Sequence, residues 1–574
     1  MKNIFFTLVT ILFMLVFVAA SKSFYRHTPF PPLVEKHDVI SCGFAVTDIT
    51  ADDNGKFICV LPGWGHYNYA VTTSNDSTQI YFNQGLSFYY GYHFREALAS
   101  FKEATRFDKS CAMAYWGQAL AMGPYYNNYY YKMGKAIPAV LQSMNNAMPA
   151  ATDKEQAMIK AMRQRYSTDT SNADRPQLDS SYAAAMHLLI KQFSGDDDIK
   201  ALYVDAVMLQ HKWDFWNNDG SSKTWTPELV KICEIILQKQ RLHPAALHYY
   251  IHLTEASKEP QVALRSAEIL KDAMPGVSHM VHMATHMYQR NGLFAKGVAV
   301  NEDANTANNK VDDLAPNLGV GKNNLVHVYA VQSYCALNAG MYSKGMPLYL
   351  RAKNRVLAQT TEIEKDTHSQ FIFMMPVMAM VRMGKWQEIL TSAVPDKHWK
   401  YAVILDDFAK GLAQVHNKNE AAAKQLLNNL EVNLQDSLLA IRSMPFNAPL
   451  QLGRIAAGIL NGELYYAAGK NEDAITAFKA AVNVEDKLFY REPQEWLLPA
   501  RQYLGAYLLK MKQAAAAEKI YREDLIANPA NGWSLLGLYQ CLLIEGKNGE
   551  ALLYKDSYIA AFKDADVMPV ASIY

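Results

Sequence analysis

The chain is poor in the residues that mark several common protein classes. Its 574 residues include six scattered cysteines and no Cys-x-x-Cys pair, which argues against a disulfide-dense scaffold, a thiolate zinc ribbon and an attached c-type haem. Lysine plus arginine number 56 and aspartate plus glutamate number 55, so the net charge of +1 creates no global field that would attract nucleic acid. With 29 glycines and 22 prolines, the composition favours helices over an all-β protein.

The motifs of several large enzyme classes are also missing. The sequence contains no phosphate-binding loop, no Gly-x-Ser-x-Gly elbow and no His-Glu-x-x-His pair. The commonest signatures of nucleotide-binding proteins, serine hydrolases and metalloproteases are therefore absent. Hydrophobic residues make up 50% of the chain and charged residues 19%, which supplies enough apolar material for a large core and argues against disorder.

Residues 1–20 predict a secretory signal peptide. Lys2 precedes an almost wholly apolar stretch over 4–18, and Ala19 and Ala20 supply small residues at a cleavage site. We expect an exported protein, periplasmic or secreted, with no stable membrane span after cleavage. The alternative is a retained membrane anchor, because the apolar stretch is of borderline length for a span. In an oxidising compartment Cys42 and Cys59 are close enough in sequence to form a disulfide, the alternative being two free thiols.

Internal periodicity predicts the fold. Three segments match the pattern of the 34-residue tetratricopeptide repeat (TPR), in which small and aromatic residues at fixed positions let two antiparallel helices pack closely. The matching residues are Tyr81, Gly85, Phe88, Ala97, Phe101 and Ala104, then Gly462, Tyr465, Ala474, Phe478 and Ala481, and finally Leu504, Gly505, Ala517, Tyr521 and Pro529. We predict an all-α fold, with an irregular N-terminal segment over 21–77 and a TPR-like superhelical solenoid of helical pairs over 78–574. Each pair of a solenoid packs only on its neighbours, so the array presents a concave groove.

Histidine is concentrated in one region of the chain. Six of the 16 histidines fall within 44 residues, where uniform scatter would place about one. These six are His243, His248, His252, His279, His282 and His286. On a helix, His248, His252 and Glu255 share an arc of about 60°. The spacing of His279, His282 and His286 places them on a similar arc of a second helix.

The two histidine stripes are expected to face one groove. Pro260 and Pro275 break the chain around one intervening helix, and helices two elements apart are adjacent in a solenoid of helical pairs. Such stripes are able to supply three to five ligands to one divalent ion of zinc, iron or copper. The predicted ligands are His248, His252, Glu255, His279, His282 and His286, with His243 in reserve. The alternatives are a polar substrate groove without metal and a structural seam of hydrogen-bonded imidazoles.

Other features are predicted to be structural. His66 and His327 are isolated histidines, which more often satisfy a local hydrogen bond than bind a metal. Trp213 and Trp216 are expected to pack at a helix end, the alternative being a ligand platform, and residues 490–493 predict a non-helical connector.

Several sequence blocks occur in the order found in one family. They are 81–86, 111–117 with Gly123-Pro124, 213–216, 243–252, 279–286, Glu492-Pro493 with Trp496 and Pro499, and 531–535. Through them the chain resembles, over most of residues 65–565, a large family of exported bacterial tetratricopeptide-repeat proteins of mostly unestablished activity. The family's histidine motifs are matched by His-Pro-x3-His-x3-His from His243 and His-x2-His-x3-His from His279. One departure is Ala284-Thr285, where relatives carry Pro-Ser. The resemblance implies a helical solenoid with this histidine motif, and no particular reaction.

Three functions are compatible with these features. The first is a binding module whose concave groove holds a protein, peptide or other ligand, with a His/Glu metal site in the groove. The second is a metal-dependent enzyme of the cell envelope, in which Glu255 serves as a ligand or general base. The third is a metal carrier or sensor.

Overall fold

A computed structural model describes residues 30–36, 49–127, 131–168, 174–319, 325–443, 446–566 and 568–574. The predicted signal peptide and Cys42 lie outside these residues. The described elements are β1 (Val34–Lys36), α2 (Asp76–Tyr90), α3 (Phe94–Phe107), α4 (Ala112–Ala121), α5 (Ile137–Ala147), α6 (Asp153–Gln164), α7 (Arg175–Gln192), α8 (Asp197–Gln210), α9 (Thr226–Lys239), α10 (Pro244–Thr254), α11 (Leu264–Ala273), α12 (Ser278–Arg290), α13 (Phe294–Leu314), α14 (Leu325–Asn338), α15 (Met346–Gln359), α16 (Thr367–Arg382), α17 (Trp386–Thr391), α18 (Lys400–His416), α19 (Glu420–Asn433), β2 (Ile441–Ser443), α20 (Pro449–Ala467), α21 (Asn471–Glu485), α22 (Ala500–Lys510), α23 (Ala514–Ala527), α24 (Gly532–Ile544) and α25 (Asn548–Ala561).

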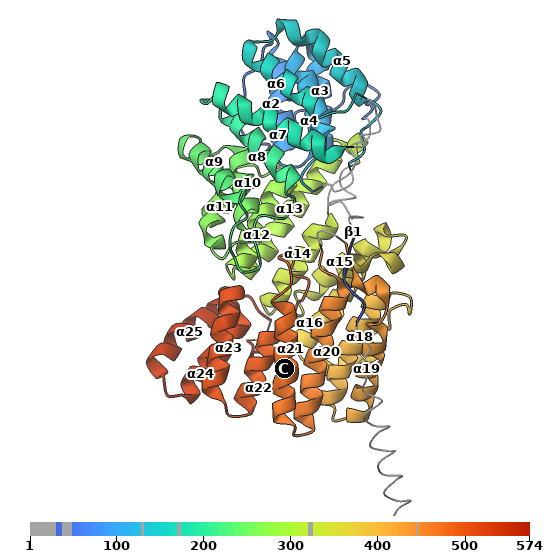
Figure 1. Cartoon of the computed structure of the whole chain (residues 1–574), viewed down its shortest axis with the longest axis vertical. Coiled ribbons are helices and arrows are strands. Elements are labelled where there is room, and N and C mark those ends of the chain that lie inside the picture. The colour runs from blue at the N-terminus through green and yellow to red at the C-terminus, as the bar shows by residue number, and fades with distance from the viewer. Residues whose placement is uncertain are drawn as a thin grey trace, which may run out of the picture.

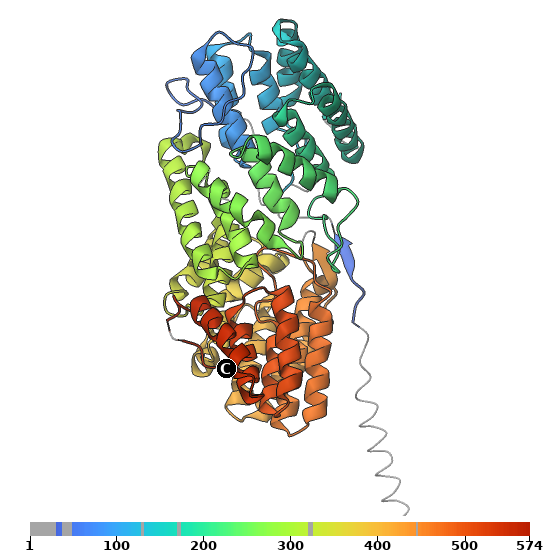
Figure 2. The same cartoon turned by 90° about the vertical axis from the view of Figure 1, so that its left-hand side faces the viewer.

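Successive helices pack as antiparallel pairs, and the prediction of an all-α, TPR-like solenoid is confirmed. Two hydrophobic cores run through the array, one from Ile49 to Leu318 and the other from Phe294 to Ile573. They correspond to the upper and lower halves of the molecule in Figure 1, and Figure 2 shows the same halves one above the other after a quarter turn. In the described part of the chain, no helix has both the length and the hydrophobicity of a membrane span.

The repeat residues act through close helix packing. Phe101 on α3 is completely buried, and Gly85 on α2 and Gly117 on α4 lie against its ring. A Cβ atom at Gly85 would come within 2.8 Å of that ring, and one at Gly117 within 2.4 Å. The small residues of the repeat therefore create the space that the aromatic side chain fills, which is why the sequence pattern predicts the pairing.

The described residues of the N-terminal segment that precede α2, 30–36 and 49–75, contain no helix. β1 pairs in parallel with β2 of the lower half, while residues 49–75 follow the upper half. At Gly63, which has a φ of +77°, the segment comes so close to Gly276 that the Gly276 amide donates a 2.8 Å hydrogen bond to the Gly63 carbonyl. This contact holds the segment against the turn that begins α12.

Replacing Gly276 with alanine is expected to destabilise the upper half by about 1–3 kcal/mol, because overpacking forces the backbone to move. The new Cβ would lie 2.1 Å from the Pro62 carbonyl oxygen, which has no flexible side chain to displace. Gly134→Ala is the matched control, since nothing lies within 4 Å of its Cβ position. Hydrogen exchange of the amides in the upper half checks the prediction, and equal protection in the two variants would contradict it.

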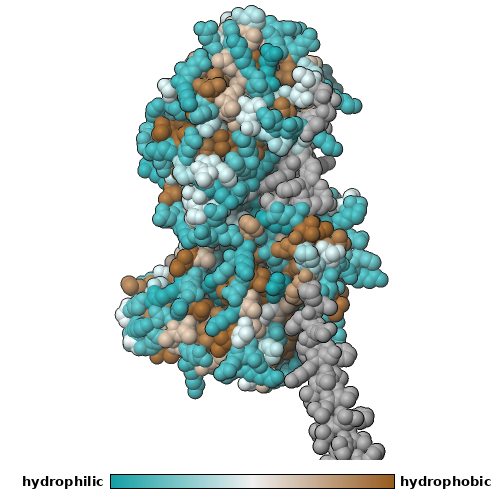
Figure 3. Space-filling model, viewed as in Figure 1, coloured by the Kyte–Doolittle hydropathy of each residue, from teal (hydrophilic) through white to brown (hydrophobic). Residues whose placement is uncertain are grey.

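The upper and lower halves meet at a narrow waist, seen from one side in Figure 3 on a mostly hydrophilic face. A connector between α21 and α22 lies at this waist and contributes Tyr490, Arg491 and Gln494 to cavities that the upper half also lines. The described residues of this connector contain no helix, as expected for 490–493. The waist is therefore built from chain segments more than 200 residues apart, and the histidine cluster lies beside it.

Candidate metal centre

Three neighbouring helices carry the histidines of the cluster. α10 provides His248 and His252, α12 provides the stripe that begins at His279, and α14 provides His327. α10 contacts α12, and α12 contacts α14, because each is the first helix of successive pairs. The predicted stripes therefore face each other, and the ring centroids of His252 and His279 lie 6.3 Å apart.

Two groups of three imidazoles form within the cluster, and in each group the nearest ligand atoms lie within 4.8 Å of one another. The upper triad consists of His248, His252 and His279, and the lower triad consists of His282, His286 and His327. In the upper triad the Nε2 atoms of His248 and His279 are 3.2 Å apart. In the lower triad the Nε2 atoms of His282 and His286 are 3.1 Å apart.

In His248 and His282 the opposite ring nitrogen, Nδ1, is held by a hydrogen-bond acceptor. The Nδ1 of His248 lies 2.6 Å from the carbonyl oxygen of Tyr90, and the Nδ1 of His282 lies 2.6 Å from the Oδ1 of Asn301. Because the amide nitrogen of Asn301 donates to a backbone carbonyl, its oxygen faces the ring. These acceptors place the proton on Nδ1 and leave the Nε2 lone pair directed into the cluster.

Glu255 connects the two stripes. Its Oε1 lies 2.9 Å from the Nδ1 of His252, and its Oε2 lies 2.6 Å from the Nδ1 of His286. Both carboxylate oxygens thus accept from imidazoles, one on each helix. The role of general base considered for Glu255 would require breaking one of these bonds, whereas supporting two ligand rings uses both.

Burial keeps most of the cluster neutral. Together with the neighbouring His286, burial lowers the pKa of both His252 and His282 to about 3. It also lowers the pKa of His248 and His279 well below the usual range. Burial opposes a proton on His286 as well, but Glu255 and Glu492 outweigh it and raise the pKa of His286.

His243 is the predicted residue that the structure does not bring into the cluster. It precedes α10, and its Nδ1 accepts a hydrogen bond from the Ala246 amide at the helix start. Its Nε2 lies 3.3 Å from the Tyr67 hydroxyl, next to the buried Asp198. His243 therefore caps a helix and belongs to a separate hydrogen-bond network.

Sequence reasoning missed several contributors because they come from distant segments. His327 was expected to be structural, yet it completes the lower triad, with its ring centroid 4.9 Å from that of His282. His327 lies about one helical pair beyond His286 in the sequence. The repeat period could therefore have indicated that His327 occupies the next first helix, beside the histidines of α12. Asn301 comes from α13, while Arg491 and Glu492 come from the connector of the lower half, and no local spacing links them to the histidines.

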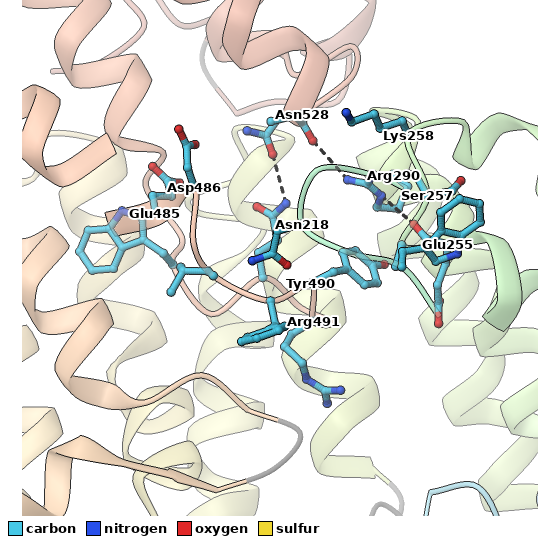
Figure 4. A pocket seen from close by; sticks show the side chains of 18 of the residues that line it. Asn218, Glu255, Ser257, Lys258, Arg290, Glu485, Asp486, Tyr490, Arg491 and Asn528 are labelled. Carbon is cyan, nitrogen blue, oxygen red and sulfur yellow. Dashed lines mark hydrogen bonds between the residues drawn. The ribbon is translucent and has the colours of Figure 1, made fainter. Parts of the chain in front are cut away.

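Two cavities adjoin the cluster. The smaller, of about 30 Å³, is lined by His252, His279, His286 and His327 and so touches both triads. This volume is about that of one water molecule. The larger cavity, of about 590 Å³, lies between the halves, and Figure 4 shows the side chains that line it. His252 and Arg491 line both cavities, so the cluster lies at the inner end of a space open to a ligand.

The larger cavity is closed on one side by contacts between the halves. Arg290 on α12 donates to the carbonyl oxygens of Glu255 and Ser257 in the upper half and to that of Ala527 in the lower half (Figure 4). Trp213, with a φ of +59°, contributes an aromatic wall, and its ring meets that of His252 edge to face at 5.7 Å. The alternative of a ligand platform for Trp213 is compatible with this position.

No family model matches the chain, and no curated protein matches it. The solved structures similar to it include the human IFIT1 dimer with m7Gppp-AAAA, at 12% identity over 85% of this chain and 96% of that chain, with a TM-score of 0.34. The APC/C hetero-tetramer Cut9-Hcn1 is similar at 13% identity over 86% of this chain and 76% of that chain, with a TM-score of 0.25. The TPR domain of P58(IPK) is similar at 14% identity over 85% and 95%, with a TM-score of 0.20.

Proposed function

We propose that the two histidine triads hold divalent transition-metal ions, one in each triad, and that this centre acts on a ligand bound in the cavity between the halves. The contact between His282 and His286 carries the proposal. Both Nδ1 atoms face acceptors, so when both rings are neutral their two Nε2 lone pairs point at each other across 3.1 Å. Two ligand nitrogens about 2.0–2.1 Å from one ion lie at about this separation. A cation between them removes the repulsion.

The donor set favours metals that prefer imidazole. Zinc, copper, iron and nickel are bound by neutral imidazole, whereas magnesium and calcium prefer oxygen ligands. The buried His252 supports the same proposal, because its Nε2 has no hydrogen-bond partner among the described residues while its Nδ1 is held by Glu255. Acceptors on the far ring nitrogens are the usual support of metal-binding histidines.

Catalysis is the second candidate function, favoured by the number of ligands. Three protein ligands per ion leave a coordination position open, as catalytic zinc sites do, and the small cavity touches both triads. A carrier or sensor would instead be expected to close its site with four protein ligands.

The proposal of export rests on the N-terminal sequence. For a protein or peptide partner, the surface we propose is the groove of the solenoid.

Metal analysis of the full chain, purified without a histidine tag or chelator, tests the proposal. After reconstitution with zinc, we expect the wild type to bind two ions per chain. The double variants His248→Gln/His279→Gln and His282→Gln/His286→Gln are each expected to retain one ion. A proton on His286, which the raised pKa of that ring favours, would relieve the contact without metal. Wild-type protein that stays metal-free after reconstitution would therefore rule out the metal centre and leave the two metal-free alternatives, a polar substrate groove and a structural seam.

A further inference from the structure

We propose that Arg491 forms an anion subsite beside the histidine cluster, and that the ligand of the cavity is a small organic anion whose carboxylate or phosphate group binds this guanidinium. The inference extends the proposed function, because the metal centre would bind the other side of the same anionic group. The inference rests on the position of Arg491, a residue to which the proposed metal centre gives no role.

Arg491 is an arginine that lacks the partners a buried charge normally has. Only 3% of its surface is exposed, and its Nε and Nη1 atoms have no hydrogen-bond partner among the described residues. No carboxylate of those residues lies within ion-pair distance of it. The nearby Glu495 carboxylate instead accepts two hydrogen bonds from Asn447. The buried Glu492 and Glu495 carboxylates are close enough to attract this charge, but neither forms an ion pair with it. A buried guanidinium without a direct anionic partner is costly, so this arrangement indicates a place for an anionic ligand.

The arginine is held in place and directed into the cavities. Its guanidinium stacks on Trp213 at 4.4 Å and on Phe446 at 4.8 Å, so aromatic rings from both halves support it. In Figure 4 its side chain leaves the connector in a different direction from Tyr490, which points toward Glu255. It lines the small cavity together with four cluster histidines, and it lines the large cavity as well.

The surroundings specify the class of ligand. The planar fork of a guanidinium matches the oxygens of a carboxylate or phosphate group, which imidazole-bound metal ions also bind. The small cavity has room for about one oxygen atom of such a group, and the large cavity of about 590 Å³ is of the size that accommodates a small molecule. The anionic end would therefore lie between Arg491 and the triads, with the remainder of the ligand in the large cavity.

Titration of the full chain with acetate and with inorganic phosphate tests the subsite, and acetamide serves as the uncharged counterpart of acetate. Tryptophan fluorescence reports binding, because Trp213 stacks on Arg491. We expect saturable binding of at least one of the two anions, weakened about tenfold or more in Arg491→Met, which keeps an apolar stem and removes the charge. Arg491→Lys should restore part of the affinity. A preference for phosphate over acetate, or the reverse, identifies the group.

Arg501→Met is the matched control. Arg501 lines the same large cavity, but its guanidinium is paired with Asp486, so its removal should leave anion affinity unchanged. Wild-type protein that binds neither anion, acetamide that binds as tightly as acetate, or equal affinities in wild type and Arg491→Met would overturn the subsite. The acetamide comparison needs no variant and so remains decisive if Arg491→Met does not fold. Metal content, measured on the same samples before and after chelation, separates failure of the subsite from failure of the metal centre.

Discussion

Replacing Glu255 with glutamine is expected to weaken zinc binding by about 10–100-fold, the usual cost of losing a group that supports metal-binding histidines. The carboxylate accepts from the Nδ1 of His252 in the upper triad and from the Nδ1 of His286 in the lower triad. Glutamine keeps one acceptor oxygen but presents an N–H₂ group to the second ring. One imidazole must then change its tautomer or turn, which moves its Nε2 lone pair away from the ion.

The loss should be measured by competition with a chromophoric chelator at fixed pH. Glu259→Gln is the control, because Glu259 follows closely on the same segment and is exposed. Both proteins should have the same circular dichroism spectrum. Because Glu255 contacts one ring of each triad, we expect both ions to bind more weakly. Unchanged affinity in Glu255→Gln would show that the imidazoles do not depend on this carboxylate for their orientation.

Replacing Phe101 with alanine is expected to destabilise the first repeats by about 3–5 kcal/mol, the typical cost of truncating a buried aromatic side chain. The ring is completely buried between Gly85 and Gly117, and it also packs on Phe82 with a centroid distance of 5.4 Å. Because both flanking residues are glycines, the helices on either side have no side chain at these positions to fill the space, and we expect a cavity to remain where three helices meet.

Hydrogen exchange is the appropriate measurement, because a long solenoid with two cores does not unfold as a single unit. Protection should fall in α2–α4 and stay unchanged in α22–α24, where Tyr521 fills the equivalent space between Gly505 and Gly537. Phe107→Ala on the same helix is the control, since that ring is 38% exposed and should cost far less. A uniform loss of protection along the chain would contradict the quasi-one-dimensional packing.

The sequence was sufficient to predict the fold because its determinants are local. Glycine and aromatic residues at fixed repeat positions, such as Gly85 and Phe101, specify how one helix packs on the next, and each pair repeats the same contact. The helical period was likewise enough to place His248 and His252 on one face and His282 and His286 on another. Two faces on adjacent first helices must meet, so this part of the candidate site followed from the sequence pattern.

The remainder of the site depended on contacts between distant segments. His327 joins the lower triad from the next helical pair, and Arg491 reaches the cavities from a connector of the other half. His243, inside the densest histidine motif, is instead directed to a helix start and to Tyr67. Periodicity determines which side of a helix a residue occupies. The curvature of the solenoid, which brings its two halves together at the waist, decides which of those sides share a cavity.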